Sequence, residues 1–254
     1  MALHDLKAVN ENTEITVVND ALVIDLKLCH FHFQPIFSLL NDSICMYEAL
    51  LRVDDMRFNS IENVVVNLIE AGRSDELTLF TLASITPYLH SPKYKEKIFT
   101  LNFDPCQLAS DRFIDIIVNF FKSNSLHPSR VMFELTERPC SDAIFFKLIC
   151  NANRLVNIGF DFAIDDFGTG IANFQLLTKL QAKLLKLDGT FGMSALNSKT
   201  SKAILGIAST FRDNFDCSVC IEGLETNEHI ALAKQMRFCY GQGYGLERPA
   251  ELRL

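Results

Sequence analysis

Acidic and amide residues recur at the ends of short apolar segments along this chain. Glu134 closes the run Val131-Met-Phe-Glu134, and Asp165 closes the run Phe162-Ala-Ile-Asp165. Carboxylates gathered in one place repel one another unless cations neutralise them or their pKa values rise. Because the set contains only oxygen ligands, with no histidine or cysteine pattern beside it, it indicates Mg²⁺ or Mn²⁺ and not zinc. The set is Glu48, Asn102, Glu134, Asp165, Asp166, Asp188, Glu222 and Gln242.

These residues meet only if the segments that carry them lie side by side. The segments are short, apolar and β-branched, and amphipathic helical stretches separate most of them, which is the alternation of a parallel sheet with crossover helices. In a closed barrel of such strands, the carboxyl ends form the catalytic face. The predicted strands are 30–37, 44–51, 97–103, 130–135, 161–164, 183–187, 218–221 and a short one near 239–242.

Eight strands in a chain of 254 residues fit a single (β/α)8 barrel. The turn at Leu40 to Ser43 is too short for a crossover, so the first two strands form a hairpin and the first runs antiparallel. We therefore predict an α/β fold, a modified TIM (β/α)8 barrel with the first strand antiparallel. The helical periodicity predicts helices at 74–89, 111–122, 142–157, 198–215 and 227–236, with one further short helix around 21–27.

Composition limits the remaining possibilities. Residues 1–25 form a polar leader, and no linker divides residues 26–254, which we take as one domain. The formal charge of −7 excludes a general basic surface for DNA or RNA. No uncharged apolar run approaches the ~20 residues of a membrane span, which favours a cytoplasmic protein.

Cysteine and histidine give little sign of chemistry. The eight cysteines lack the spacing of a disulfide scaffold, so we interpret them as reduced and mostly as small core residues, including the Cys217–Cys220 pair. His30 and His32 share one strand face, but no H-x-x-x-H pair is present. Core or surface roles are therefore favoured for the histidines.

Six segments in order resemble the motifs of the EAL-domain family of cyclic di-GMP phosphodiesterases. The family resemblance covers residues 30–250. One such motif alone is weak, but six in the family's order are specific. The segments are EALLR at 48–52, ELTE at 134–137, DDFGTG at 165–170, KLD at 186–188, EGLET at 222–226 and QGYG at 242–245.

This resemblance implies that the chain hydrolyses cyclic di-GMP, a bacterial second messenger, to linear pGpG. The implied reaction is a two-metal cleavage of a phosphodiester bond. It implies that 26–254 is an EAL phosphodiesterase domain and that the chain forms a homodimer. By the same resemblance, one Mg or Mn ion is held by Glu48, Asn102, Glu134 and Asp165. The second lies near Asp165, Asp166 and Glu222.

The resemblance also assigns further roles. Catalytic roles fall to Glu48, Lys186 and Glu225, with Lys186 beside the attacking water. Arg52 is placed on a phosphate oxygen, where the guanidinium fork suits the geometry. Glu137 is placed as a brace for the loop after DDFGTG. The implied substrate-binding residues are Gln34, Arg52, Asp188 and Gln242.

Three departures from the family pattern leave an alternative open. The segment Val53 to Phe58 lacks the usual Trp and His-Pro, Ile171 to Phe174 replaces the usual Tyr-Ser-Ser-Leu, and Asp104 replaces a usual serine. The alternative is a weak or inactive EAL module that acts as a cyclic di-GMP receptor, or that binds a protein partner and regulates it. We favour the enzyme because the predicted metal carboxylates are all retained. An unrelated enolase-like barrel explains the acidic strand ends but not the order of the motifs.

Overall fold

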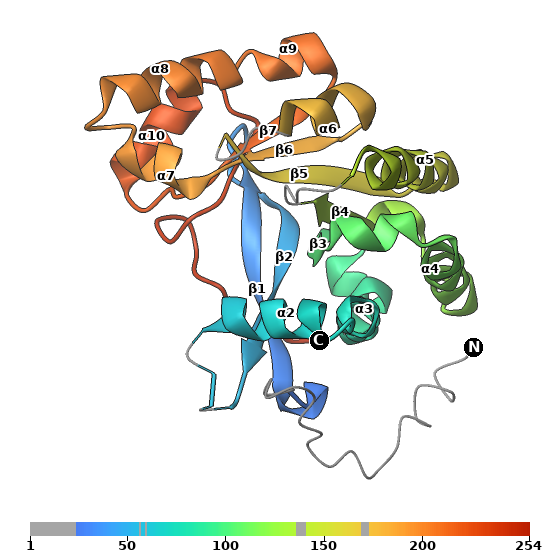
Figure 1. Cartoon of the computed structure of the whole chain (residues 1–254). Coiled ribbons are helices and arrows are strands. Elements are labelled where there is room, and N and C mark those ends of the chain that lie inside the picture. The colour runs from blue at the N-terminus through green and yellow to red at the C-terminus, as the bar shows by residue number, and fades with distance from the viewer. Residues whose placement is uncertain (1–23, 56, 59, 136–140, 169–172) are drawn as a thin grey trace.

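The computed structural model describes residues 24–254 apart from 56, 59, 136–140 and 169–172. In this part of the chain, the strands close into a barrel in chain order from β1 to β8, with helices around it (Figure 1). β1 is antiparallel to both of its neighbours, β2 and β8, and the remaining pairs are parallel. The predicted modified barrel is confirmed. The strands are β1 Cys29–Ser38, β2 Ile44–Val53, β3 Ile98–Phe103, β4 Val131–Leu135, β5 Asp161–Phe167, β6 Leu184–Leu187, β7 Ser218–Ile221 and β8 Tyr240–Gly241.

A tight turn between β1 and β2 accounts for the reversed first strand. The Ser38 N–H donates to the Ser43 carbonyl over 2.8 Å, and Asp42 has a φ of 56°, which aspartate tolerates in turns. The register places Gln34 opposite Glu48 and Cys29 opposite Val53. The amino-terminal end of β1 therefore lies at the same end of the barrel as the carboxyl end of β2.

Most helices begin at a serine or threonine whose side chain accepts a backbone hydrogen bond, as Ser60 does from Asn63 and Ser110 does from Phe113. The amphipathic helices cover the outside of the barrel. The helices are α2 Ile61–Glu70, α3 Ser74–His90, α4 Asp111–Ser123, α5 Asp142–Ile158, α6 Asn173–Lys179, α7 Gly189–Ser194, α8 Lys199–Ala208, α9 Phe211–Phe215 and α10 Asn227–Gln235, with short 3-10 turns η1 Leu26–Leu28, η2 Pro92–Tyr94, η3 Pro105–Ala109 and η4 Pro128–Arg130.

Two helix predictions need correction. The single helix expected over 198–215 is two helices, because α8 ends at Ala208. There the Ser209 hydroxyl donates to the Gly206 carbonyl and the Thr210 hydroxyl to the Ile207 carbonyl, so side chains compete with the backbone and end the helix. The short helix expected around 21–27 is a 3-10 turn, η1, in its described part. Helices α2, α6 and α7 were not expected.

The core has two parts. The larger part fills the space between the strands and the surrounding helices. A smaller cluster lies inside the barrel, where the inward-facing residues of β1, β2, β4, β5, β6 and β7 each contribute one side chain. The members of this inner apolar layer are Ile36, Met46, Met132, Ala163, Leu184 and Cys220.

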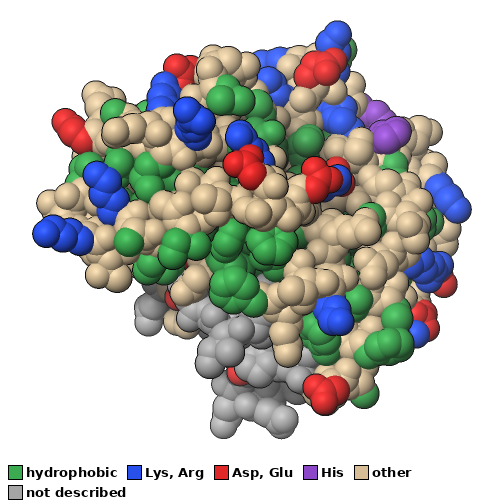
Figure 2. Space-filling model, turned by 90° about the horizontal axis from the view of Figure 1, so that it is seen from above, with side chains coloured by type: hydrophobic (Ala, Val, Ile, Leu, Met, Phe, Trp, Pro, Cys, Tyr) green, Lys and Arg blue, Asp and Glu red, His purple; other side chains and the backbone are tan. Residues whose placement is uncertain are grey.

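The face of the molecule seen in Figure 2 carries charges of both signs. Seen from above, Lys and Arg side chains are scattered among Asp and Glu over this face (Figure 2). In the described part of the chain, no helix combines the length and the apolarity needed to cross a membrane. Cys217 and Cys220 are free and buried, and burial raises the pKa of Cys217 to about 11.

Candidate active site

A polar layer lies directly above the inner apolar layer of the barrel. Side chains alternate along a strand, so residues two apart share a face. Glu48 follows Met46 by two residues on β2, and Glu134 follows Met132 by two on β4. The strands that build the apolar layer therefore also present the polar residues to the barrel mouth. The same spacing relates Ala163 to Asp165, Leu184 to Lys186 and Cys220 to Glu222.

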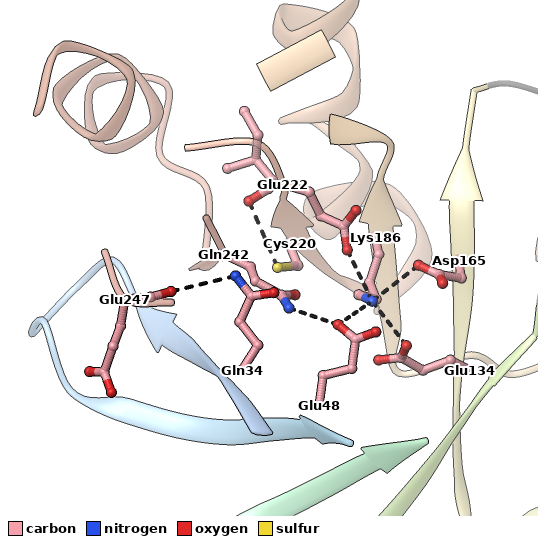
Figure 3. A network of polar contacts seen from close by, with 10 residues as sticks. Gln34, Glu48, Glu134, Asp165, Lys186, Cys220, Glu222, Gln242 and Glu247 are labelled. Carbon is pink, nitrogen blue, oxygen red and sulfur yellow. Dashed lines mark hydrogen bonds and ion pairs between the residues drawn. The ribbon is translucent and has the colours of Figure 1, made fainter. Parts of the chain in front are cut away.

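The Lys186 ammonium group lies at the centre of this polar layer (Figure 3). Its side chain is only 1% exposed, and carboxylates from four different strands or strand ends surround it. The distances from Lys186 Nζ are 2.9 Å to Glu134 Oε2, 2.9 Å to Glu222 Oε1, 3.1 Å to Asp165 Oδ1 and 3.2 Å to Glu48 Oε2.

The pKa values record a conflict between burial and charge. Burial disfavours the Lys186 ammonium form, but the surrounding carboxylates outweigh it and raise the Lys186 pKa well above its usual value. Burial raises the pKa of Glu134 well above its usual value, and Lys186 offsets only part of that shift. One ammonium group thus fails to neutralise the carboxylates around it.

Asp165 and Asp166 both reach the mouth although they are consecutive residues. In a regular strand they would point to opposite faces. The pairing of β5 with β6 shifts between Ile164 and Phe167, and Asp166 has a φ of 50°. This left-handed conformation costs an ordinary residue about 1–2 kcal/mol. As a result, one oxygen each of Asp165, Asp166 and Glu222 lie within 4.8 Å of one another.

Burial also perturbs the other acids of this group. Burial is the largest cause that raises the pKa of Glu222 to about 7; Lys186 opposes the shift, and the nearby Asp165 and Glu48 add to it. The pKa of Asp166 is raised as well, first by burial and then by Asp165 and Asp188. Because these neighbouring carboxylates repel one another, a bound cation would relieve the repulsion and is therefore favoured at this position.

Glycines allow the turn that carries Glu222 to pack against α7. A Cβ atom on Gly192 would lie 1.8 Å from the Glu222 carbonyl oxygen, and a Cβ atom on Gly223 would lie 2.3 Å from the Gly189 carbonyl oxygen. Both contacts are far inside van der Waals distance. The start of α7 and the end of β7 therefore approach closely only because these positions lack side chains.

A cavity of about 400 Å³ opens above the carboxylates, within the size range of small-molecule sites. Gln34 and Gln242 line it. Gln242 Nε2 donates to Glu48 Oε2 over 2.7 Å, and Gln34 Nε2 donates to the Glu247 carbonyl over 3.5 Å. Gln242 thus connects the end of β8 to the carboxylate cluster, whereas Gln34 connects β1 to the carboxyl-terminal segment at Glu247 (Figure 3).

The donor set fits divalent cations. Glu134 Oε1 and Gln242 Oε1 are buried and have no hydrogen-bond partner among the described residues. Carboxylate and amide oxygens are the donors that Mg²⁺ and Mn²⁺ prefer. An excess of negative charge, buried unpartnered oxygens and the Asp165, Asp166 and Glu222 group together suit such ions.

Several predicted site residues lie at the edge of this arrangement. Asn102 is in register with Glu134 but is exposed, and with Arg52 it lines a neighbouring cavity. Arg52 Nη1 donates to the Leu51 carbonyl over 2.8 Å. Asp188 accepts the Thr190 N–H at the start of α7, and Glu225 is exposed at the cavity wall.

The remaining predicted residues are Glu137, the brace of the loop after DDFGTG, and positions where the chain departs from the family pattern. Glu137, Ile171 and Ala172 lie outside the described residues. Asp104 accepts the Cys106 N–H and caps η3, so this carboxylate has a structural partner.

Sequence reasoning missed a residue at the rim of the cavity. Tyr244 lines the cavity and is half exposed. The Arg248 guanidinium carbon lies 4.2 Å from the centre of its ring, a cation–π contact that orients the ring. Tyr244 belongs to the QGYG segment, from which Gln242 was predicted to bind substrate, and this position was the feature of the sequence that could have indicated it.

Comparison with known proteins identifies relatives of this barrel. The EAL domain family matches residues 18–249. A relative from Escherichia coli (strain K12), the "Probable cyclic di-GMP phosphodiesterase PdeA", is 31% identical over 181 residues, which is 70% of this chain and 25% of PdeA. The chain thus spans about a quarter of the length of that relative.

Solved structures share the same architecture. The EAL enzyme Bd1971 in its cGMP-bound form matches with a TM-score of 0.80 and 25% identity over 89% of this chain and 63% of that one. The PaMucR phosphodiesterase in complex with c-di-GMP matches with a TM-score of 0.80 and 23% identity over 98% of this chain and 96% of that one.

Proposed function

The chain belongs to the EAL domain family, and on this premise we propose that it hydrolyses cyclic di-GMP to linear pGpG. The observation that carries the proposal is the meeting of Glu48, Glu134, Asp165 and Glu222 around Lys186 beneath an open cavity. Buried carboxylates this close together are costly unless cations neutralise them, which favours a metal-dependent reaction. The names of PdeA and of the PaMucR complex support the same substrate.

We assign the cations to the oxygen donors of the barrel mouth. Glu48, Asn102, Glu134 and Asp165 would hold one ion, and Asp165, Asp166 and Glu222 would hold the second. When bound, two such ions activate water and neutralise the charge that develops on the phosphate. Lys186 would yield part of its ion pairing as the ions enter, since their charge replaces that of the ammonium group.

The chain's own residues would then orient the reactants. In hydrolysis, the water oxygen bonds to phosphorus as the P–O3′ bond breaks, and a proton ends on O3′. Lys186 would hold the water by a hydrogen bond, and Arg52 would turn from the Leu51 carbonyl to a phosphate oxygen. Glu225 at the cavity wall would exchange protons with solvent, and Glu137 would brace the loop after DDFGTG. Gln34, Asp188 and Gln242 would contact the substrate.

Product analysis tests the proposal. The purified chain is incubated with cyclic di-GMP and either Mg²⁺ or Mn²⁺, and the products are separated by chromatography. We expect linear pGpG, abolished by a chelator and by Glu48→Gln but retained by Glu70→Gln, whose side chain is exposed at the end of α2. Comparison of the two ions also identifies the preferred metal. Absence of pGpG with either ion would contradict the proposal.

The second candidate is a receptor that binds cyclic di-GMP without cleaving it, or a module that regulates a protein partner. The positions of Arg52 and Asn102 favour it, because both line a cavity beside the carboxylate cluster and not the cluster itself. Binding of cyclic di-GMP by calorimetry, together with no pGpG, would select this candidate. The proposed homodimer is tested separately by light scattering of the purified chain.

A further inference from the structure

Two histidines on β1 and a glutamate near the carboxyl terminus meet outside the carboxylate cluster. One ligand atom each of His30, His32 and Glu251 lie within 4.8 Å of one another. The two imidazole rings lie edge to face, with centroids 5.5 Å apart. All three side chains have access to solvent, so an ion can enter.

The fold holds these side chains together through the backbone. His30 and His32 are two residues apart on a strand and therefore share a face. The Phe33 N–H donates to the Ala250 carbonyl over 2.8 Å, and the Ala250 N–H donates to the Phe33 carbonyl over 3.1 Å. This antiparallel bridge places Glu251 opposite His32, on the same face.

The carboxyl-terminal segment is anchored beyond that bridge as well. The Tyr94 hydroxyl donates to the Arg253 carbonyl over 2.8 Å, and Lys93 Nζ donates to the same oxygen over 2.7 Å. Glu251 therefore lies between two fixed points of backbone. Its position beside the histidines follows from these bonds and not from the side chain alone.

A further carboxylate orients one of the histidines. His30 Nδ1 lies 3.4 Å from Asp54 Oδ2, and the Asp54 N–H donates to the Leu28 carbonyl over 2.9 Å. A carboxylate on one ring nitrogen fixes the imidazole and leaves Nε2 for an ion, as is usual around histidine ligands. Arg52 is opposite His30 in the sheet, so Asp54 and Glu251 together outweigh one guanidinium charge.

We propose that His30, His32 and Glu251 form a second metal site, selective for Zn²⁺ and separate from the oxygen-only cluster. Two imidazoles and one carboxylate are a donor set of Zn²⁺, with water in the fourth position, whereas Mg²⁺ favours oxygen donors alone. Tetrahedral bonds of about 2.0–2.1 Å bring ligand atoms to about 3.3 Å apart. The ligand atoms must therefore move closer together than they lie now, and the exposed Glu251 side chain can rotate toward the two histidines.

Metal titration tests this site without recourse to activity. Co²⁺, which takes tetrahedral histidine sites and then absorbs strongly in the visible range, is titrated into the full chain in excess Mg²⁺ and displaced by Zn²⁺. We expect one tetrahedral equivalent. His30→Ala and His32→Ala should weaken it by more than about 100-fold, and Asp54→Asn by about 10-fold. His90→Ala, an exposed histidine on α3, is the matched control and should change nothing.

The outcomes separate clearly. Glu251→Gln, on the exposed terminal segment, should also abolish the tetrahedral spectrum while leaving the thermal unfolding of the metal-free chain unchanged. No tetrahedral Co²⁺ in the unaltered chain, or a spectrum that survives in His32→Ala or Glu251→Gln, would overturn the site. Because the readout is a spectrum in excess Mg²⁺, it is independent of whether the chain cleaves cyclic di-GMP.

Discussion

Gln242 and Glu48 are 194 positions apart in the chain, yet Gln242 Nε2 donates to Glu48 Oε2 over 2.7 Å. The same Glu48 oxygen lies 3.2 Å from Lys186 Nζ. Glu48 is therefore held from two sides, once by the end of the last strand and once by β6. The position of this carboxylate depends on closure of the whole barrel.

Replacement of Gln242 should reveal that dependence. Methionine is similar in length to glutamine but has no amide group, so in Gln242→Met the buried Glu48 carboxylate loses a hydrogen-bond donor. Hydrogen bonds to charged groups contribute about 1.5–3 kcal/mol. We expect the free energy of unfolding, measured in urea, to decrease by an amount within that range. Gln34→Met is the matched control and should cost less, because its amide donates over 3.5 Å to a neutral carbonyl. Equal losses in the two variants would contradict this interpretation.

Lys186→Met should destabilise the metal-free chain by about 3–5 kcal/mol at pH 7, because it leaves buried carboxylates without their cation. Those carboxylates then bind protons more tightly in the folded state than in the unfolded state, so stability should rise as pH falls from 8 to 6. Mn²⁺ should restore part of the loss. Urea denaturation at both pH values measures these effects. Lys183→Met, whose side chain is 55% exposed, should change the midpoint little.

The Glu222 pKa of about 7, raised by burial, makes metal affinity dependent on pH. A protonated carboxyl group binds metal poorly, so protons compete with the ion below pH 7. Affinity should therefore fall about tenfold between pH 8 and pH 6 from this group alone. Calorimetry at both pH values, in buffers of different ionisation enthalpy, measures the affinity and the proton released. If Glu222→Gln shows the same pH dependence in this range, another group is responsible.

Gly192→Ala should shift Glu222 and destabilise the chain by more than about 1 kcal/mol, because the new Cβ atom would lie 1.8 Å from the Glu222 carbonyl. Gly206→Ala, in the helix α8, is the matched control. Its nearest neighbour is a methionine methyl group at 3.9 Å, so alanine should stabilise by about 0.4–1 kcal/mol. Thermal unfolding of both variants gives the comparison. Similar signs for the two changes would contradict the close approach of α7 to the Glu222 turn.

Thiol reactivity should separate the cysteines by burial. Burial raises the pKa values of Cys29 and Cys217 to about 11, so only about a thousandth of each is thiolate at pH 8. Cys150 is exposed and should be alkylated by iodoacetamide at least about a hundredfold faster. Mass spectrometry of peptides over a time course measures the rates. Modification of Cys217 at the rate of Cys150 would indicate a reactive pair in the Cys217–Cys220 segment.

The strands and the central site were predictable because both follow local rules. Each strand is a short apolar run, and the polar residue two positions after an inward apolar residue must share its face, as with Met132 and Glu134. The hairpin followed from the shortness of the turn between β1 and β2. These features depend on neighbours in the sequence, so a single chain reveals them.

Other features depend on contacts between distant residues. Helix α2 contains three consecutive valines, which lower helix propensity, and its packing on the barrel compensates for them. Helix α7 contains two glycines, and the close approach to the Glu222 turn requires one of them, Gly192. The placement of Arg52 depends on its side-chain conformation, and the meeting of Glu251 with His32 depends on a bridge between the ends of the domain.

The antiparallel first strand also decides how this domain can be attached to others. In an all-parallel barrel, the chain enters at the end opposite the catalytic face. Here Cys29 pairs with Val53, so the chain enters at the open mouth. A reporter protein fused ahead of Ile24 would have its linker beside the barrel mouth. The same strand carries Gln34, which lines the cavity above the carboxylates, so an attachment made there joins the barrel on the side of that cavity.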